Sequence, residues 1–262
     1  MIKLIISDMD GTLLNQEREI PESFRNLLPQ LAQKGIRFAV ASGRQYPTLQ
    51  DLFRRAEQEI IYIAENGGLV EYQGKILSCD EVKKKDLATM IELSRHYKGT
   101  CFLVSSEKMA FIEQPEHEAM LTDIKTYFHH LQVLEDLTRI EEPLLKFSIY
   151  HPEEIQGALF EAFAPFQKDY HVVIAGEHWI DISSLETNKG KAVHQIKEQL
   201  QLTSDEVMIF GDQLNDAPMM QEAYWSYAMQ NAHPELKKVA RFETKLSNAE
   251  EGVIATIQEI LG

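Results

Sequence analysis

The chain has 262 residues, of which 44% are hydrophobic, so it is long enough to bury a full core, either as one large domain or as a domain with an insertion. Its 26 Lys and Arg stand against 41 Asp and Glu, a formal charge of −15 at pH 7. Such a surface repels nucleic acid and anionic lipid, which argues against both as partners. The sequence has no run of about 18 apolar residues and no signal-peptide pattern. We therefore expect a cytoplasmic protein that does not enter membranes.

The amino-terminal part alternates predicted strands with predicted helices. Apolar runs at 2–6, 36–40 and 60–63 predict buried strands, and helical spacing over 24–31 and 47–57 predicts helices between them. This alternation is typical of an α/β protein with a doubly wound, parallel, Rossmann-like sheet. In such sheets ligands bind at the carboxyl ends of the strands.

The pattern changes over about 83–185, where helical stretches near 86–97 and 152–166 alternate with strand-like runs at 100–104, 145–150 and 171–174. We expect these residues to form an inserted α+β domain that covers a core made of 1–82 and 186–262. The core pattern resumes with a helix opening at Lys189, strands at 206–210 and 224–229, and a helix at 250–261.

Cysteine and histidine usage narrows the chemistry. Cys79 and Cys101 lack CxxC spacing and have no histidines beside them, so we expect reduced, structural thiols rather than a disulfide or a zinc site. The nine histidines include the pair His129 and His130 but form no HExxH motif, which argues against metal binding by histidine.

Two aspartates follow the first predicted strand, in the run Asp8-Met9-Asp10-Gly11-Thr12. In extended backbone, residues two apart point the same way, so Asp8 and Asp10 can address one small volume beyond the strand. Two like charges so close coexist if a divalent cation neutralises them or if one carboxyl stays protonated. Gly11 allows a sharp turn there. Alone, the motif could be a helix cap, but not a calcium-binding EF-hand loop, because glycine follows Asp10 directly.

Further polar residues lie where the core pattern predicts strand or helix ends. They are Ser42, Gly43 and Arg44 after the second strand, Lys189 at a helix start, and Asp212, Asn215 and Asp216 after the strand at 206–210. In this order, the groups resemble the four motifs of the haloacid dehalogenase superfamily of phosphohydrolases. The chain is similar to its Cof-like subgroup, whose members carry a large cap between the second and third motifs. The resemblance extends through Asn66-Gly67, Gly190, 228–232 and Gly252-Val253.

The resemblance implies a Mg²⁺-dependent phosphatase that works through an aspartyl-phosphate. Asp8 would attack phosphorus, and Asp10 would protonate the leaving alkoxide and later deprotonate the hydrolytic water. The cation would be held by the Asp8 carboxylate, the backbone carbonyl of Asp10 and the Asp212 carboxylate, with Asp216 as a direct ligand or steadying the site from behind.

The resemblance also implies which groups bind the phosphoryl oxygens: Ser42, Lys189, Asn215 and the backbone N–H groups near Met9 and Gly43. Lys191 is the rival of Lys189 for this role. Arg44 and Asn66 are candidate substrate contacts, although Arg44 could instead pair with a neighbouring acid and Asn66 could only form a turn. The chain departs from the subgroup at Gln230, where glycine is common, and at Glu65, where a small or hydroxyl residue is frequent.

The expected substrate is a small phosphorylated metabolite such as a sugar phosphate, acted on by a monomer or weak homo-oligomer. Asp10 separates this expectation from related chemistries, because dehalogenases lack the second aspartate and ion-pumping ATPases carry threonine there. The alternative is a sugar-phosphate-binding regulator that retains the fold without catalysis.

Overall fold

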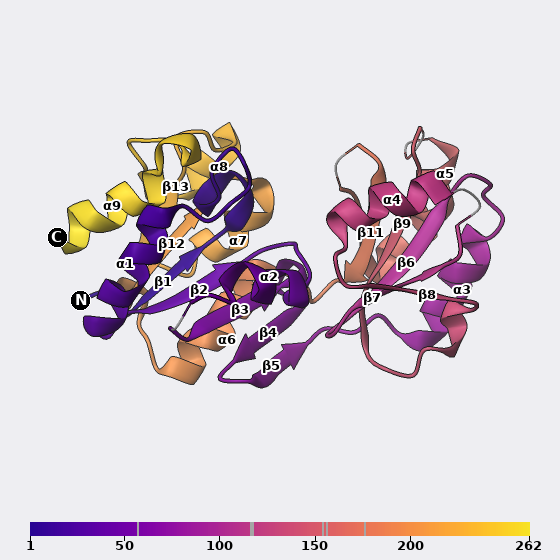
Figure 1. The fold of residues 1–262 in the computed structure, drawn as a ribbon, viewed down its shortest axis with the longest axis horizontal. Coiled ribbons are helices and arrows are strands. Elements are labelled where there is room, and N and C mark those ends of the chain that lie inside the picture. The colour runs from indigo at the N-terminus through magenta and orange to yellow at the C-terminus, as the bar shows by residue number, and fades with distance from the viewer. Residues whose placement is uncertain (57, 116–117, 154, 156, 176) are drawn as a thin grey trace. The chain divides into compact units, whose positions relative to one another are not determined.

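The structure is a computed structural model that describes residues 1–262 except 57, 116–117, 154, 156 and 176 (Figure 1). The chain forms two units. The core unit comprises Met1–Arg44, Leu49–Ser78 and Asn188–Gly262, and the inserted unit comprises Gln45–Thr48 and Cys79–Thr187. Within the described residues, no helix combines the length and the apolarity needed to cross a bilayer.

An eight-stranded sheet with the order β14-β13-β12-β1-β2-β3-β4-β5 forms the centre of the core unit. Its strands are β1 (Leu4–Ser7), β2 (Arg37–Ala41), β3 (Ile60–Ala64), β4 (Leu69–Tyr72), β5 (Lys75–Cys79), β12 (Val207–Gly211), β13 (Trp225–Ala228) and β14 (Phe242–Glu243). The strands from β14 to β3 are parallel, and β4 runs antiparallel to β3. The order reverses at β1, which lies between β12 and β2. This reversal places a ligand-binding crevice at the carboxyl end of β1.

Helices cover the core sheet. They are α1 (Glu22–Gln33), α2 (Tyr46–Phe53), α6 (Lys189–Leu200), α7 (Ala217–Met220), α8 (Pro234–Val239) and α9 (Gly252–Leu261). α1 lies beside α9, and α6 packs against α7 (Figure 1). All four residues of β1 are fully buried, although successive side chains point to opposite faces, so both faces of the sheet are covered there.

The inserted unit contains a six-stranded sheet with the order β10-β11-β9-β6-β7-β8, antiparallel except for the β7–β8 pair. Its strands are β6 (Cys101–Ser106), β7 (Ala110–Glu113), β8 (Leu131–Leu134), β9 (Leu144–Tyr150), β10 (Tyr170–Ile174) and β11 (Trp179–Ser184). Phe147 and Ile149 pack on one face with α3 (Lys84–Ser94) and α5 (Ala158–Phe163). Tyr150 packs on the other with α4 (Glu118–Tyr127). Each face therefore has its own apolar layer.

The predicted fold class, an α/β core with an inserted α+β domain, is confirmed. The expectation of a wholly parallel core sheet is wrong at its β4–β5 edge. The chain reverses between β3 and β4 at a turn where Glu65, Asn66 and Gly67 have positive φ (48°, 57° and 97°), and Gln73 and Gly74 (55° and 72°) form a second tight turn between β4 and β5.

Two predicted helices are too long. The helix predicted at 47–57 ends at Phe53, and its last residue, 57, lies outside the described residues. The helix predicted at 152–166 is α-helical only over Ala158–Phe163 and continues as a 3-10 helix over Ala164–Lys168, with 154 and 156 outside the described residues. Gly157 has a φ of 70° at the start of α5, a backbone conformation that begins a new helix rather than continuing one.

Candidate active site

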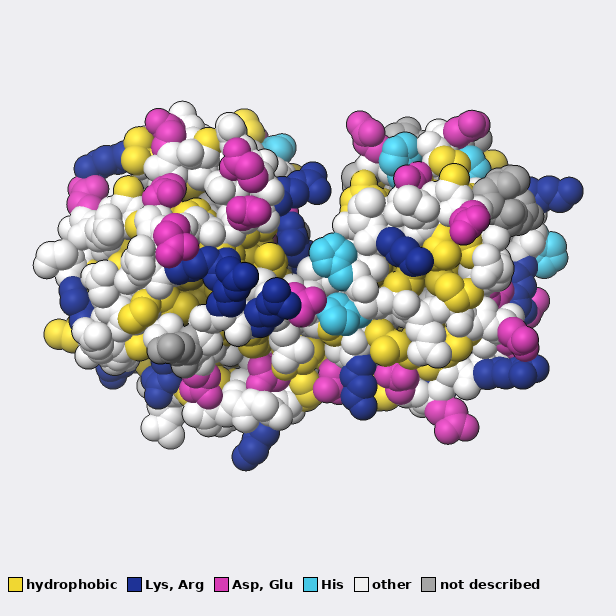
Figure 2. Space-filling view, viewed as in Figure 1, with side chains coloured by type: hydrophobic (Ala, Val, Ile, Leu, Met, Phe, Trp, Pro, Cys, Tyr) yellow, Lys and Arg dark blue, Asp and Glu magenta, His cyan; other side chains and the backbone are white. Residues whose placement is uncertain are grey.

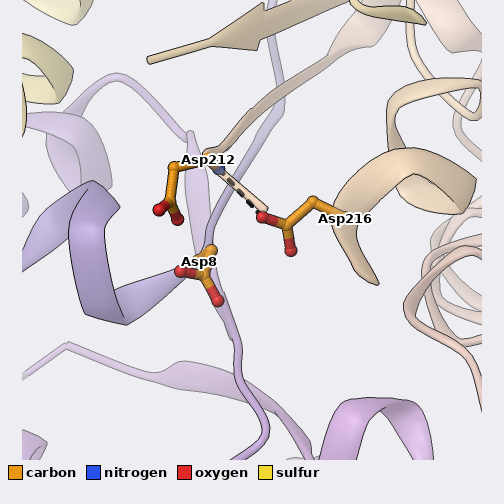
Figure 3. Close-up of side chains that lie close together, drawn as sticks. All are labelled: Asp8, Asp212 and Asp216. Carbon is orange, nitrogen blue, oxygen red and sulfur yellow. Dashed lines mark hydrogen bonds between the residues drawn. The ribbon is translucent and has the colours of Figure 1, made fainter. Parts of the chain in front are cut away.

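Three carboxylates meet at the carboxyl ends of β1 and β12. Asp8 follows β1, Asp212 follows β12, and Asp216 comes from the short 3-10 turn Leu214–Asp216. Because β1 and β12 are adjacent and parallel, their carboxyl ends lie at the same edge of the sheet. One oxygen of each side chain lies within 4.8 Å of the others, and Figure 3 shows the three side chains around a common space. The sequence predicted this grouping.

Lys189 lies between two of these carboxylates. Its Nζ is 2.6 Å from Asp8 Oδ1 and 2.6 Å from Asp216 Oδ1, and its side chain is fully buried. Lys189 is the first residue of α6, and the Asn188 side chain caps this helix by accepting a hydrogen bond from the N–H of Lys191 at 2.8 Å. Lys189, one of the two candidate lysines, therefore forms an ion pair with Asp8.

A glycine lets α6 approach closely enough to place that lysine. A Cβ on Gly190 would lie 2.7 Å from the backbone carbonyl carbon of Pro218 in α7, far closer than packed atoms allow. The absence of a side chain at 190 therefore lets the start of α6 pack directly on α7.

Hydrogen bonds from backbone N–H groups fix the loop that carries Asp212 and Asp216. Asp216 Oδ2 accepts from the N–H groups of Asp212 at 2.9 Å and Gln213 at 3.1 Å; the first of these bonds is the dashed line in Figure 3. Thr12 Oγ1 donates to Asp212 Oδ1 at 2.9 Å. Gln213 Nε2 donates to Asp212 Oδ2 at 3.2 Å, so both oxygens of Asp212, like both oxygens of Asp216, accept hydrogen bonds from the protein.

The buried setting changes the acidity of this cluster. Burial raises the pKa of Asp8 to about 8, with the charges of Asp216 and Asp212 adding to the rise and Lys189 opposing it. Burial followed by the charge of Asp216 raises the pKa of Asp212. Burial lowers the pKa of Lys189, but Asp216 and Asp8 together more than reverse this, so the pKa lies above its ordinary value. An excess of negative charge confined in a buried site accounts for all three directions.

The donor set fits a divalent cation. Three carboxylates face one ammonium, which leaves a net local charge of −2 when all are ionised. The donors are all oxygen atoms, which hard cations such as Mg²⁺ prefer. Each of the three carboxylates also accepts hydrogen bonds from the protein: Asp8 and Asp216 from Lys189, and Asp212 from Thr12 and Gln213.

Asp10 has different surroundings, although it is only two residues from Asp8. Its side chain is 49% exposed and receives two hydrogen bonds from Arg44, Nε to Oδ2 at 2.7 Å and Nη2 to Oδ1 at 2.5 Å. Its carboxylate is not one of the three clustered carboxylates. Gly11 turns the chain with a φ of 79°, and a Cβ at this position would overlap the Asp212 carboxylate.

Two residues predicted to bind phosphate, Gly43 and Asn215, both lie against Asn66, a predicted substrate contact. Asn215 Nδ2 donates to Asn66 Oδ1 at 3.0 Å, and the Asn66 amide lies against Gly43. Ser42 accepts the N–H of Arg44 on its Oγ at 3.2 Å. The structure thus brings Asn215, Asn66 and Gly43 together. Arg44 pairs with a neighbouring acid, one of its two predicted alternatives.

Met9 is fully buried, and its carbonyl accepts the N–H of Leu14 at 2.9 Å. Its role as a backbone phosphate donor stays a prediction.

Thr12 and Asn231 have contacts in the site that sequence reasoning did not assign. Thr12 bonds Asp212, and Asn231 Nδ2 donates to the carbonyl of Gly11 at 2.8 Å. Thr12 lies in the first motif and Asn231 in the 228–232 segment that carried part of the family resemblance. Their position within those motifs was the signal in the sequence that could have identified them. The contacts themselves join residues up to 220 positions apart, so local spacing could not predict them.

The clustered acids lie on an α/β core of the haloacid dehalogenase type, and comparison with known proteins agrees on this class of protein. A family model described as haloacid dehalogenase-like hydrolase matches residues 5–257. The chain belongs to this family, and the predicted membership is confirmed.

Among its relatives, the Escherichia coli 5-amino-6-(5-phospho-D-ribitylamino)uracil phosphatase YbjI is 32% identical, with 99% of this chain and 96% of that protein covered. The Bacillus subtilis 5-amino-6-(5-phospho-D-ribitylamino)uracil phosphatase YcsE is 28% identical over 98% of this chain and 95% of that protein. The solved structure of SMU.1108c from Streptococcus mutans aligns with a TM-score of 0.85 at 29% identity, covering 100% and 99% of the two chains. The prediction of an enzyme of the phosphatase class is thereby confirmed.

Proposed function

We propose that the protein is a Mg²⁺-dependent phosphatase that hydrolyses small phosphomonoesters, such as sugar phosphates, through an aspartyl-phosphate on Asp8. The observation that carries this proposal is the contrast between two neighbouring aspartates. Asp8 is buried against Lys189, whereas Asp10 is half exposed and held by Arg44. Two carboxylates in such different surroundings suit two roles, a nucleophile and a general acid and base.

In the first step, an oxygen of Asp8 attacks phosphorus in line with the leaving group. The bond from phosphorus to the ester oxygen breaks, and Asp10 gives its proton to the departing alkoxide. In the second step, Asp10 takes a proton from water as that water attacks the phosphorus of the aspartyl-phosphate, which returns Asp8 and releases phosphate. Arg44 positions the Asp10 carboxylate through both steps.

Lys189 and the loops around Asp8 supply the positive and polar groups. Lys189 fixes the rotamer of Asp8 and offsets negative charge beside it. Ser42, Gly43 and Asn215, with Asn66, are the candidate ligands of the phosphoryl oxygens. Asp8, Asp212 and the backbone carbonyl of Asp10 would hold Mg²⁺, with Asp216 behind them. When bound, the cation offsets the repulsion between the carboxylates and an anionic substrate.

In this proposal, the cap domain at 83–185, inserted in the chain between the core segments 1–82 and 186–262, selects the substrate. The Escherichia coli relative is named for a phosphorylated ribitylamino compound. A phosphorylated ribitylaminouracil therefore belongs among the substrates to be tried. A cytoplasmic location and a monomer or weak homo-oligomer complete the proposal, supported by the composition and the charge of −15.

The test is phosphate release from sugar phosphates, the phosphorylated ribitylamino compound, nucleotides, pyridoxal phosphate and p-nitrophenyl phosphate, with Mg²⁺ or with EDTA. Wild type is compared with Asp8→Asn and with Asp205→Asn, a matched control at an exposed aspartate. We expect turnover that requires Mg²⁺, is retained in Asp205→Asn and falls by at least about 10³-fold in Asp8→Asn.

Equal turnover in Asp8→Asn and wild type would eliminate the aspartyl-phosphate mechanism. If wild type binds Mg²⁺ and phosphate but hydrolyses none of these compounds, the sugar-phosphate-binding regulator becomes the better description.

A further inference from the structure

We propose that Asn231 and Asn248 are positioning residues of the active site, which together hold the loop after Asp10 in the geometry required for Mg²⁺ binding. This inference rests on the proposed function for its kinetic consequences. Its structural basis is a chain of side-chain hydrogen bonds from the carboxyl-terminal part of the core unit to residues 11–14.

Asn231 lies after β13 and uses both ends of its amide. Its Nδ2 donates to the carbonyl of Gly11 at 2.8 Å, and its Oδ1 accepts the N–H of Asn248 at 3.0 Å. One partner can only accept and the other can only donate, so the orientation of the amide follows from its surroundings. Neither bond survives if the amide flips.

Asn248 adds a second connection to the same loop. Its Nδ2 donates to the carbonyl of Leu14 at 2.9 Å. Asn248 begins a 3-10 turn whose start is fixed by a capping box between Ser247 and Glu250, with Ser247 Oγ 2.9 Å from Glu250 Oε2. The two asparagines therefore join both ends of the Gly11–Leu14 segment to a rigid turn.

The segment that carries Asn231 also holds the strand that leads to Asp212. The N–H of Met229 donates to the carbonyl of Gly211 at 2.9 Å, and the N–H of His233 donates to the carbonyl of Asp212 at 2.8 Å. Asn231 lies midway between these two anchor points. It thus links the loop of the nucleophile to the strand end that bears Asp212.

Small movements of the loop reach Asp212 directly. Gly11 lies so close to the Asp212 carboxylate that a Cβ would overlap it, and the Thr12 hydroxyl donates to Asp212 Oδ1 at 2.9 Å. The carbonyl of Asp10, a proposed Mg²⁺ ligand, belongs to the peptide just before Gly11. Loss of the Asn231 bond therefore removes one restraint on the peptide between Asp10 and Gly11 and on the neighbouring Thr12 hydroxyl, which contacts Asp212.

Asn231 is exposed and Asn248 only partly buried, so neither side chain fills the core. Truncating either side chain should disturb the geometry of the site more than it lowers the stability of the fold. Residues that orient metal ligands from behind typically change metal affinity or activity by about 10- to 100-fold when mutated.

The experiment compares wild type with Asn231→Ala, Asn231→Asp and Asn248→Asp, with the exposed Asn26→Ala on α1 as the control. Asn231→Asp keeps the acceptor for Asn248 and loses the donor to Gly11, whereas Asn248→Asp loses only the donor to Leu14. The measurements are Mg²⁺ affinity by calorimetry without substrate, amide hydrogen exchange of residues 11–14, melting temperature, kcat and KM.

We expect Asn231→Ala and Asn231→Asp to weaken Mg²⁺ binding and lower kcat by about 10- to 100-fold, with KM within about 3-fold of wild type. Exchange over residues 11–14 should accelerate while the melting temperature stays near that of wild type. Asn248→Asp should show a smaller change in the same direction, and Asn26→Ala none.

Wild-type Mg²⁺ affinity and wild-type exchange in folded Asn231→Ala would overturn the proposal. The proposal would also fail if both Asn231 variants were so destabilised that unfolding explained the whole loss of Mg²⁺ binding, because Asn231 would then have a structural role. If wild type hydrolyses no phosphomonoester, the proposed function fails by itself, and Mg²⁺ affinity and exchange still decide this inference.

Discussion

At the scale of residues, the buried ammonium of Lys189 holds together a group of carboxylates that would otherwise repel one another. Lys189 contacts Asp8 and Asp216 at 2.6 Å each and is fully buried. Burying such charges is costly, and removing one partner leaves the others uncompensated. The stability of the core and the charge balance of the site therefore depend on the same side chain.

Replacing Lys189 by methionine should lower the free energy of unfolding by about 3–5 kcal/mol without Mg²⁺, because buried carboxylates lose their only cationic contact in the cluster described. Urea unfolding measures the change. Lys191→Met is the matched control two residues along the same helix and should cost less than about 1 kcal/mol. Equal losses in the two variants would show that Lys189 has no special role.

Arg44 should matter through the geometry of its contact with Asp10. A guanidinium forms two parallel hydrogen bonds with a carboxylate, as here, and an ammonium cannot reproduce them. We expect Arg44→Lys to lower kcat/KM by about 10- to 100-fold, because the Asp10 carboxylate loses its fixed orientation. Steady-state kinetics with the best substrate found tests this, and unchanged kcat/KM would exclude a positioning role.

The acidity of Asp8 predicts a pH dependence of metal binding. Burial raises the pKa of Asp8 to about 8, so below that pH the protonated carboxyl opposes Mg²⁺, and above it the ionised carboxylate is ready to bind. Mg²⁺ affinity should therefore rise with pH up to about pH 8 and then level off, with proton release on binding at neutral pH. Calorimetry in buffers of different ionisation enthalpy measures this release. Asp8→Asn should abolish it, and pH-independent binding by wild type would contradict the assignment.

The sequence predicted which residues lie at the strand ends better than it predicted the hydrogen-bond partners of those residues. Asp8 and Asp212 could be placed together because adjacent parallel strands end at one edge of the sheet. The Arg44–Asp10 pair and the Asn231–Gly11 bond depend on the path of loops and on rotamers. Spacing along the chain does not determine either one.

At the scale of elements, Gly11 and Gly35 both have a positive φ, but only Gly11 is close to another side chain. Comparing the two positions distinguishes backbone strain from steric crowding. Gly11 has a φ of 79° and faces the Asp212 carboxylate, whereas Gly35, after α1, has a φ of 72° and has open space where a Cβ would lie. An alanine at either position meets the same backbone penalty, but only the one at position 11 would also meet the Asp212 carboxylate.

Gly35→Ala should therefore lower the free energy of unfolding by about 1–2 kcal/mol and leave catalysis unchanged. Gly11→Ala should cost more and should also reduce Mg²⁺ affinity and kcat, because the new methyl group displaces the Asp212 carboxylate. Denaturant unfolding, calorimetry and kinetics on both variants check this. Full activity in Gly11→Ala would show that the close approach of Gly11 to Asp212 is not required for activity.

Several strands with apolar runs were predicted from the sequence, but β4 and β7, which are also buried over most of their length, were not. β1, β2, β3 and β12 are fully or almost fully buried, so each appears as an apolar run. β8 has only intermediate and exposed residues, and its strand character comes from pairing with β7. α4, β7 and β11 were also not predicted, and their assignment depends on contacts within the inserted unit.

At the scale of the whole molecule, two kinds of negative charge have to be distinguished. The chain carries a formal charge of −15, and acidic side chains are spread over the visible face of both units (Figure 2). The buried group of Asp8, Asp212 and Asp216 is a separate, local concentration. Salt screens the first kind, whereas Lys189 offsets only part of the second and a bound divalent cation would offset the rest.

Thermal unfolding should separate these two effects. Raising NaCl from about 10 mM to about 150 mM shortens the screening length from about 30 to about 8 Å and should stabilise wild type and Asp212→Asn to the same modest extent. Mg²⁺ at equal ionic strength should stabilise wild type further, by about 2.7 kcal/mol at 100 times its dissociation constant, because it binds only the folded site. Asp212→Asn lacks one of the proposed ligands and should lose this extra stabilisation. An equal Mg²⁺ effect in both proteins would place the cation on the general acidic surface, and an effect confined to wild type would place it in the cluster between β1 and β12.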